Sequence, residues 1–132
     1  MDQTRINFER LVTTIKTLRS EAGCPWDKKQ TTASLKKYLV EEFEEILLAI
    51  ENHDADNLCE ELGDFLYLII MLSEIHDESG QFALEDVIRN VDAKLIRRHP
   101  HVFGGKPISD SKTLRNQWRK IKEAEKAAKK NS

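Results

Sequence analysis

The chain is poor in the residues that break helices or cross-link chains. Its 132 residues include only 3 Pro, 5 Gly and 2 Cys, and aromatic side chains make up 7%. These counts exclude a collagen-like repeat, a low-complexity linker and a disulfide-stabilised scaffold. Charged residues make up 33%, against about 25% in an average soluble domain. Few helix breakers together with many charges favour long helices with polar outer faces.

Long hydrophobic segments are also absent. The longest uninterrupted apolar run covers residues 65–72, which is far short of the roughly 20 residues that cross a lipid bilayer. The first residues, MDQTRINFERL, contain no apolar stretch of the kind that forms a secretory signal. Cys24 and Cys59 lack the spacing of metal-binding cysteines and are expected to be reduced thiols. We therefore expect a cytoplasmic protein with no membrane partner.

Charges are sorted along the chain, although the net charge is only −2. Residues 41–64 hold ten acidic residues and no lysine or arginine, whereas residues 89–132 hold thirteen basic residues and four acidic ones. Two solvated helix faces would give such a pattern. An acidic middle that binds cations and a basic end that meets an anion would also give it.

Hydrophobic residues recur at helical spacing along most of the sequence, and no segment shows the strict two-residue alternation of a strand. Helices are expected at about residues 5–20, 33–51, 54–76, 84–98 and 112–129, with loops at 27–32 and 101–111. Thr32 or Ser34 is expected to cap the second helix, and Asp54 or Asp56 the third. The predicted fold class is all-α, most simply a helix bundle.

Two acidic residues fall inside the predicted apolar stripes. Because each helical residue advances by about 100°, Glu42 lies within the apolar stripe of its helix and Glu45 lies on the edge of that stripe. The next helix repeats this arrangement, with Glu61 inside the stripe and Asp64 one turn further on. Glu41, by contrast, points away from the stripe.

A short connection makes these two helices antiparallel neighbours, so that their four carboxylates converge at one rim of a shared core. Four negative charges with little water around them need compensation. A divalent cation supplies it. Mg²⁺ prefers oxygen ligands and is typically held by one or two carboxylates together with substrate phosphates. The alternative is a buried ion-pair network with lysine or arginine side chains from another helix.

Five segments carry a family resemblance. They are GCPWDKKQT (23–31), YLVEEFEEILLAI (38–50), EELGDFLY (60–67), DAKLIRRHPHVFGG (92–105) and QWRKIK (117–122). In their order and spacing, these segments resemble the MazG family of nucleoside triphosphate pyrophosphohydrolases. The resemblance covers about residues 5–125, so we expect a single MazG-like domain over residues 1–132 with a basic tail at 120–132.

The resemblance implies an all-α fold of the four-helix type that is completed as a homodimer or a higher homo-oligomer. It also implies cleavage of a nucleoside triphosphate to the monophosphate and pyrophosphate, with Mg²⁺ as the cofactor and Mn²⁺ as a substitute. Water attack at the α-phosphorus gives these products. By position, the family's four metal ligands fall on Glu42, Glu45, Glu61 and Asp64. Its phosphate-contacting lysine falls on Lys94, and its substrate-contacting tryptophan falls on Trp118.

Further candidates concern the phosphates and the attacking water. Arg97 and Arg98 would reinforce Lys94 by bidentate contacts to phosphate oxygens. Alternatively, these cations stabilise the C-terminal end of their helix through its dipole. Glu41 lies just outside the carboxylate cluster and would orient the attacking water, or it is a surface acid.

The aromatic residues are the remaining candidates for substrate binding. Trp26 and Trp118 would each stack on a base, or they would anchor a loop and dock a helix, respectively. Tyr38 lies one turn before Glu42 and would line the pocket or pack in the core. The run at 65–72 is apolar nearly all round, so its side that is not used by the core is expected to meet another subunit.

Three other functions compete with this reading. A relative on the same fold would act on dUTP, dCTP or phosphoribosyl-ATP. A non-catalytic regulator would bind nucleotide and metal without turnover, although the four carboxylates and Lys94 argue against it. A nucleic-acid binder would use the basic C-terminal third, but the sequence contains no base-reading motif, so nucleic acid is not an expected partner.

Overall fold

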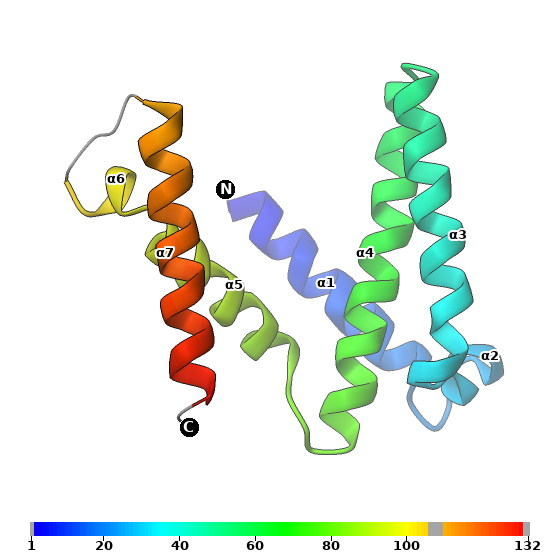
Figure 1. Ribbon diagram of the computed structural model, residues 1–132. Coiled ribbons are helices and arrows are strands. Elements are labelled where there is room, and N and C mark those ends of the chain that lie inside the picture. Colours follow the sequence, from blue (N-terminus) through cyan, green and yellow to red (C-terminus); the bar gives the residue numbers. More distant parts are fainter. Residues whose placement is uncertain (1, 106–109, 131–132) are drawn as a thin grey trace. The chain divides into compact units, whose positions relative to one another are not determined.

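A computed structural model describes residues 2–105 and 110–130, and all regular structure within these ranges is helical. The helices are α1 (Asp2–Leu18), α2 (Pro25–Lys29), α3 (Thr32–Glu51), α4 (Ala55–Glu78), α5 (Leu84–Arg98), α6 (Pro100–Phe103) and α7 (Ser111–Lys130) (Figure 1). The all-α prediction is therefore confirmed for the described residues. The chain divides into two units, Met1–Leu84 and Glu85–Ser132.

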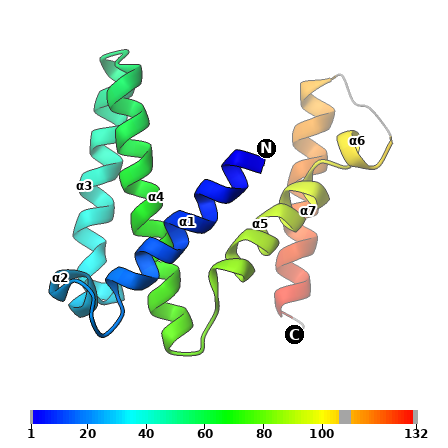
Figure 2. The ribbon, with the colours of Figure 1, turned by 180° about the vertical axis from the view of Figure 1, so that it is seen from behind.

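The first unit is built on an antiparallel hairpin of α3 and α4, and α1 packs across α4 (Figures 1 and 2). Thr31 caps α3, because its side chain accepts a hydrogen bond from the Ser34 backbone N–H, and Asp54 caps α4. The cap expected at Thr32 or Ser34 is therefore at Thr31, with Ser34 as the second member of the capping box, whereas the cap at Asp54 is confirmed. The core lies where the three helices meet and consists of Ile15, Leu35, Leu68, Ile70 and Met71.

The short helix α2 lies where the sequence predicted a polar loop. The chain reaches it through a turn that only glycine fits, because a Cβ atom on Gly23 would lie 2.2 Å from the Leu18 carbonyl oxygen. Pro25 then occupies the first turn of α2, where its missing N–H costs nothing. Asp27 is only 5% exposed, and its carboxylate accepts a hydrogen bond from the Tyr67 hydroxyl.

Arg19 ties this segment to α4. Its guanidinium donates to the carbonyl oxygens of Asp27 at 2.6 Å and Gln30 at 3.3 Å. The same group makes two 2.8 Å hydrogen bonds to the Glu78 carboxylate. The planar guanidinium with several donors fits this arrangement, which an ammonium group does not reproduce.

Arg19→Met is expected to lower the free energy of unfolding by about 2 kcal/mol, since it leaves one carboxylate and the carbonyl oxygens of two buried residues without their charged donor. Urea unfolding followed by circular dichroism measures this loss. Arg89→Met is the matched control, because Arg89 is exposed and pairs with exposed Glu85 and partly buried Asp86 on its own helix. Its substitution should leave the midpoint unchanged. Equal midpoints for the two variants would contradict the assignment of Arg19 as a structural link.

The second unit contains α5, α6 and α7. The carboxylate of Glu125 on α7 accepts from Arg97 at 2.6 Å and from Arg98 at 2.8 Å, both at the end of α5. The short helix α6 replaces the first part of the loop that was predicted at 101–111, and residues 106–109 of that prediction lie outside the described residues. The predicted basic tail lies within α7 up to Lys130, and its last two residues are likewise not described.

Several large apolar side chains remain exposed in the single chain. On the α3–α4 hairpin, Ile50 is 52% exposed, although its position in the apolar stripe predicted burial, and its neighbour Ala49 is buried instead. The exposed apolar residues of this hairpin include Val40, Phe43, Leu47, Ile50, Leu62, Leu66 and Ile69. None of the helices in the described part of the chain is both long and apolar enough to cross a membrane.

Candidate functional site

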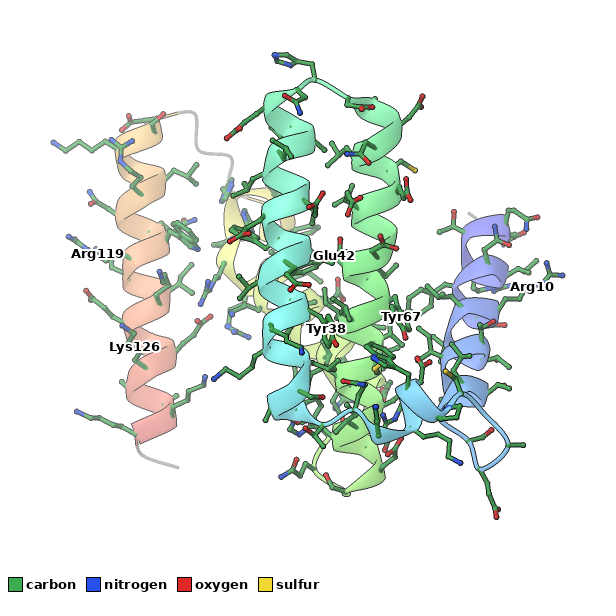
Figure 3. The ribbon with its side chains drawn as sticks, turned by 90° about the vertical axis from the view of Figure 1, so that its right-hand side faces the viewer. Arg10, Tyr38, Glu42, Tyr67, Arg119 and Lys126 are labelled. Carbon is green, nitrogen blue, oxygen red and sulfur yellow. The ribbon has the colours of Figure 1, made fainter. Side chains whose placement is uncertain are left out.

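Three carboxylates converge between α3 and α4. Glu42 comes from α3, and Glu61 and Asp64 come from α4. Each of the three residues offers one carboxylate oxygen, and these three oxygens all lie within 4.8 Å of one another. Figure 3 shows Glu42 between the two helices. Glu61 is 9% exposed, Glu42 is partly buried and Asp64 is exposed. The antiparallel hairpin thus places one predicted acid of α3 opposite the two predicted acids of α4.

Burial and crowding raise the pKa of Glu42 to about 7. The largest cause is the loss of solvation of its carboxylate, followed by a hydrogen bond with Glu61 and by the negative charges of Glu61, Asp64 and Glu45. The Oε2 atom of Glu42 is buried and has no hydrogen-bond partner among the described residues. A buried oxygen without a donor beside two other carboxylates is the arrangement that a divalent cation would satisfy.

No cation of the protein takes this place among the described residues. The ion pairs of the first unit join Lys16 with Glu74 and Arg19 with Glu78, and those of the second unit also leave the three carboxylates out. The alternative of a buried ion-pair network around the carboxylates is therefore not what residues 2–105 and 110–130 form. Their oxygen-only donor set matches hard cations such as Mg²⁺, Mn²⁺ or Ca²⁺.

Glu45 and Glu41 lie beside this cluster rather than in it. Glu45 is exposed and is not one of the three converging residues, although its charge contributes to the raised pKa of Glu42. Glu45 lies one turn beyond Glu42, on the edge of the apolar stripe. Glu41 is exposed as well, and it lines a pocket next to the cluster.

This pocket has a volume of about 190 Å³ and is lined by Trp26, Tyr38, Glu41, Glu42, Asp64, Tyr67 and Leu68. The rings of Trp26 and Tyr38 meet edge to face, with centroids 5.3 Å apart and an angle of 71° between the planes. The ammonium of Lys37 lies 5.0 Å from the centroid of the Tyr38 ring. The pocket therefore has aromatic walls and carries acidic groups.

Two pocket features were missed from the sequence. Tyr67 lines the pocket, and Asp27 accepts the hydrogen bond from its hydroxyl. A signal for Tyr67 exists, because it lies three residues after Asp64 and so shares its helix face. Asp27 carries no such signal, since its partner lies 40 residues away in the sequence.

The candidate phosphate-binding residues of the second unit differ in their contacts. Lys94 is exposed on α5. Arg97 and Arg98 both bind Glu125, and hydrogen bonds from Arg98 and then Arg97 lower the pKa of Glu125 to about 2. Both arginines therefore pair with Glu125 in this structure, an arrangement that the sequence interpretations of phosphate binding and of helix-end stabilisation did not include.

Trp118 is 46% exposed and lines a second pocket of about 190 Å³. The other lining residues are Arg98, His99, His101, Leu114 and Arg115. The ammonium of Lys122 lies 4.9 Å from the centroid of the Trp118 ring. This pocket combines aromatic rings with cationic groups, which is a suitable composition for an anion that carries an aromatic ring.

Comparisons with known proteins agree on one family. The family model described as MazG nucleotide pyrophosphohydrolase domain matches residues 30–103. That range includes all four predicted metal ligands and Lys94, but neither Trp26 nor Trp118.

Several curated relatives carry an enzymatic name. The nucleoside triphosphate pyrophosphohydrolase/pyrophosphatase MazG of Thermotoga maritima is 48% identical over 132 residues, which are 100% of this chain and 50% of that protein. The nucleoside triphosphate pyrophosphohydrolase of Escherichia coli is 41% identical over 123 residues, 92% of this chain and 47% of that protein. The chain thus spans about half the length of these relatives.

A solved structure supports the fold as well. The crystal structure of a mazG-related protein from Thermotoga maritima matches with a TM-score of 0.74 at 31% sequence identity. The match covers 87% of this chain and 98% of that one. The similarity therefore extends over nearly the whole of both chains.

Proposed function

Since the chain belongs to the MazG nucleotide pyrophosphohydrolase domain family, we propose that it hydrolyses nucleoside triphosphates to nucleoside monophosphate and pyrophosphate. The observation that carries this proposal is the convergence of Glu42, Glu61 and Asp64 around a buried carboxylate oxygen that lacks a partner. Such a cluster is unfavourable without a cation, and a nucleoside triphosphate brings phosphates that bind to the same cation.

We assign Mg²⁺ as the cofactor, with Mn²⁺ as a substitute, held by Glu42, Glu61 and Asp64. Glu45 is proposed as a fourth ligand, since its side chain follows Glu42 by one turn on the same helix. When bound, the cation neutralises negative charge on the triphosphate and on the pyrophosphate leaving group. Glu42 has to lose its proton to act as a ligand, so metal binding competes with the protonation that its raised pKa favours.

The attacking water is assigned to the acidic side of the pocket. Glu41 is exposed and lines the pocket together with Glu42 and Asp64. A carboxylate in that position accepts a hydrogen bond from water and orients it for in-line attack at the α-phosphorus. Attack at this atom leaves the β- and γ-phosphates together as pyrophosphate.

Substrate contacts are proposed in both units. Trp26 and Tyr38 give the first pocket its aromatic walls, and Trp118 gives the second pocket an exposed ring. Lys94 is assigned to the phosphates. Arg97 and Arg98 contribute to phosphate binding only if their pairing with Glu125 is loosened or shared, since both guanidinium groups are held there.

The single chain is proposed to assemble into a homodimer or a higher oligomer in the cytoplasm. Exposed apolar side chains on α3 and α4 support assembly, because their burial would remove apolar area from water. We keep a single MazG-like domain over residues 1–132, since the family match runs through parts of both units. Cys24 and Cys59 are both free, in keeping with a reducing compartment.

A product assay in ¹⁸O-labelled water tests this function. With Mg²⁺ and a panel of common, deoxy and damaged nucleoside triphosphates, we expect one pyrophosphate per monophosphate, no orthophosphate, and the label in the monophosphate. Label in the pyrophosphate would place the attack at the β-phosphorus, and orthophosphate release would indicate another reaction. The same panel, extended to dUTP, dCTP and phosphoribosyl-ATP, determines whether one of these is the preferred substrate.

A further inference from the structure

We infer that the hydrogen bond from Tyr67 to Asp27 is a positioning contact, which holds α2 so that Trp26 forms the wall against which the nucleoside part of the substrate binds. The inference rests on the proposed function, because it assigns one part of the substrate to this pocket. Neither Tyr67 nor Asp27 is a candidate site residue of the sequence or a member of the three-carboxylate cluster.

Helix α2 cannot hold its position by itself. It has only five residues, and isolated helices of that length are not stable in water. Its place is fixed by tertiary contacts: the Tyr67 hydroxyl donates to the Asp27 carboxylate, and Arg19 donates to the Asp27 carbonyl oxygen at 2.6 Å. The Gln30 side chain donates to the Trp26 carbonyl oxygen at 2.9 Å. Asp27 and Gln30 are both buried.

Of these contacts, the one with Tyr67 connects α2 directly to the pocket beside the metal cluster. Tyr67 lies one turn after Asp64 on α4, and both residues line that pocket. Figure 3 shows Tyr38, Glu42 and Tyr67 at neighbouring levels of the α3–α4 hairpin. Displacement of α2 from Tyr67 would therefore change the shape of the pocket without moving the two helices that carry the carboxylates.

Trp26 is the residue of α2 that this contact orients toward the pocket. It is adjacent to Asp27 in the sequence, and its ring packs edge to face against Tyr38, one turn before Glu42. The Asp27 carboxylate, by contrast, is not part of the converging group of Glu42, Glu61 and Asp64. It serves α2 and Tyr67, so its loss should act on the aromatic wall and not on the cation.

The chemistry of the pocket matches a nucleotide in two parts. Trp26, Tyr38 and Leu68 offer aromatic and apolar surface for a base, and stacking on such surface is worth about 1–3 kcal/mol per base. Glu42 and Asp64 belong to the cluster that binds phosphates through a cation. The affinity for a nucleoside monophosphate therefore tests the aromatic wall of the pocket. The affinity for pyrophosphate with Mg²⁺ tests the carboxylate wall, so that the two effects can be measured separately.

The test compares Tyr67→Phe with three further variants. Tyr67→Phe should raise KM and the Kd for nucleoside monophosphate about tenfold, because a buried carboxylate loses its donor and α2 loosens. The affinities for Mn²⁺ and for inorganic pyrophosphate with Mg²⁺ should stay within about twofold of wild type. Asp27→Asn keeps an oxygen that accepts from Tyr67 and should stay close to wild type, whereas Asp27→Leu should behave like Tyr67→Phe. Ser73→Ala is the control, since it deletes another buried α4 hydroxyl whose partner is the Ile69 carbonyl.

A second readout does not depend on turnover. In protein labelled with 5-fluorotryptophan, the ¹⁹F resonance of Trp26, assigned by Trp26→Phe, should shift or broaden in Tyr67→Phe but not in Ser73→Ala. The inference is overturned if the Trp26 resonance stays unchanged, if monophosphate affinity is unaltered, or if Tyr67→Phe weakens Mn²⁺ binding to the same extent. Wild-type protein that releases no pyrophosphate would instead refute the proposed function, while the ¹⁹F comparison would still decide whether Tyr67 positions Trp26.

Discussion

Glu61→Gln is expected to lower the rate of pyrophosphate release by about 10²–10⁴-fold, because a metal ion that stabilises transition-state charge contributes several kcal/mol. Glu61 is the most buried member of the three-carboxylate cluster. Glutamine has the same shape, but it removes one negative charge and one of the two ligand oxygens. The rate is measured with a coupled pyrophosphate assay at saturating nucleotide and Mg²⁺. The helical circular dichroism signal should stay unchanged.

Glu60→Gln is the matched control for this prediction. Glu60 is the preceding residue of α4, is exposed, and is not part of the converging group. Its substitution makes the same chemical change on the same helix and should leave pyrophosphate release near the wild-type rate. Near wild-type turnover by Glu61→Gln, or an equal loss in Glu60→Gln, would contradict the assignment of Glu61 as a metal ligand.

The second large effect concerns Glu42 and the stability of the metal-free protein. Its pKa is about 7 in the folded chain, against an ordinary value of 4.5, so the folded state holds this proton more tightly than the unfolded state. The resulting stabilisation is present in full below about pH 4.5 and is lost as the pH rises through about 7. Because one pKa unit corresponds to about 1.4 kcal/mol, the loss reaches up to ~3 kcal/mol above pH 7.

Glu42→Gln should therefore stabilise the metal-free protein by up to ~3 kcal/mol at about pH 8 and by little at about pH 4.5, since glutamine does not ionise. Chemical unfolding of both proteins with a chelator present measures the difference at each pH. Addition of Mg²⁺ should reverse the order at the higher pH, because only the wild type gains stability by binding the cation. Glu44→Gln, on an exposed position of the same helix, should show neither effect.

Two outcomes would contradict this account of Glu42. One is a difference between Glu42→Gln and wild type that does not change between acidic and alkaline pH. The other is an equal stabilisation by Mg²⁺ in both proteins. A variant that is more stable without metal and inactive with it would show that the cluster is maintained for binding at a cost in stability.

Helical periodicity was sufficient to predict most of the fold and part of the site. Glu42 lies seven residues after Leu35 and four before Ile46, so helical geometry alone places it on the apolar face of α3. Glu61 likewise falls within the apolar stripe of α4, and it is buried. The short turn then brings both helices together, and Asp64 joins the cluster because it follows Glu61 by one turn.

Periodicity fails where a position is decided by contacts between distant residues. Helix α2 exists because Arg19 and Tyr67 hold its buried Asp27, and neither partner is visible from the local sequence. The pairing of Arg97 and Arg98 with Glu125, which lies 27 or more residues away, was likewise not predicted. Such pairings depend on tertiary geometry, which no local pattern records.

A stripe also does not tell what covers it. Ile50 belongs to the apolar stripe of α3 but is half exposed, because it lies outside the surface that α4 covers in a single chain. Glu45, on the edge of the same stripe, remains exposed beside the cluster. The exposure of both side chains depends on what packs against the α3–α4 hairpin, and the sequence of one helix does not specify that.

The central claim is that Glu42, Glu61 and Asp64 together bind a divalent cation, and calorimetric titration of Mn²⁺ or Mg²⁺ into metal-free protein tests it most directly. At about pH 6, in two buffers of different ionisation enthalpy, we expect uptake with release of about one proton, because Glu42 is then largely protonated and must ionise to bind. Proton release should vanish above about pH 8, and Glu42→Gln should lose the uptake. Absence of uptake even with a nonhydrolysable nucleotide, or undiminished uptake by Glu42→Gln, would contradict the claim.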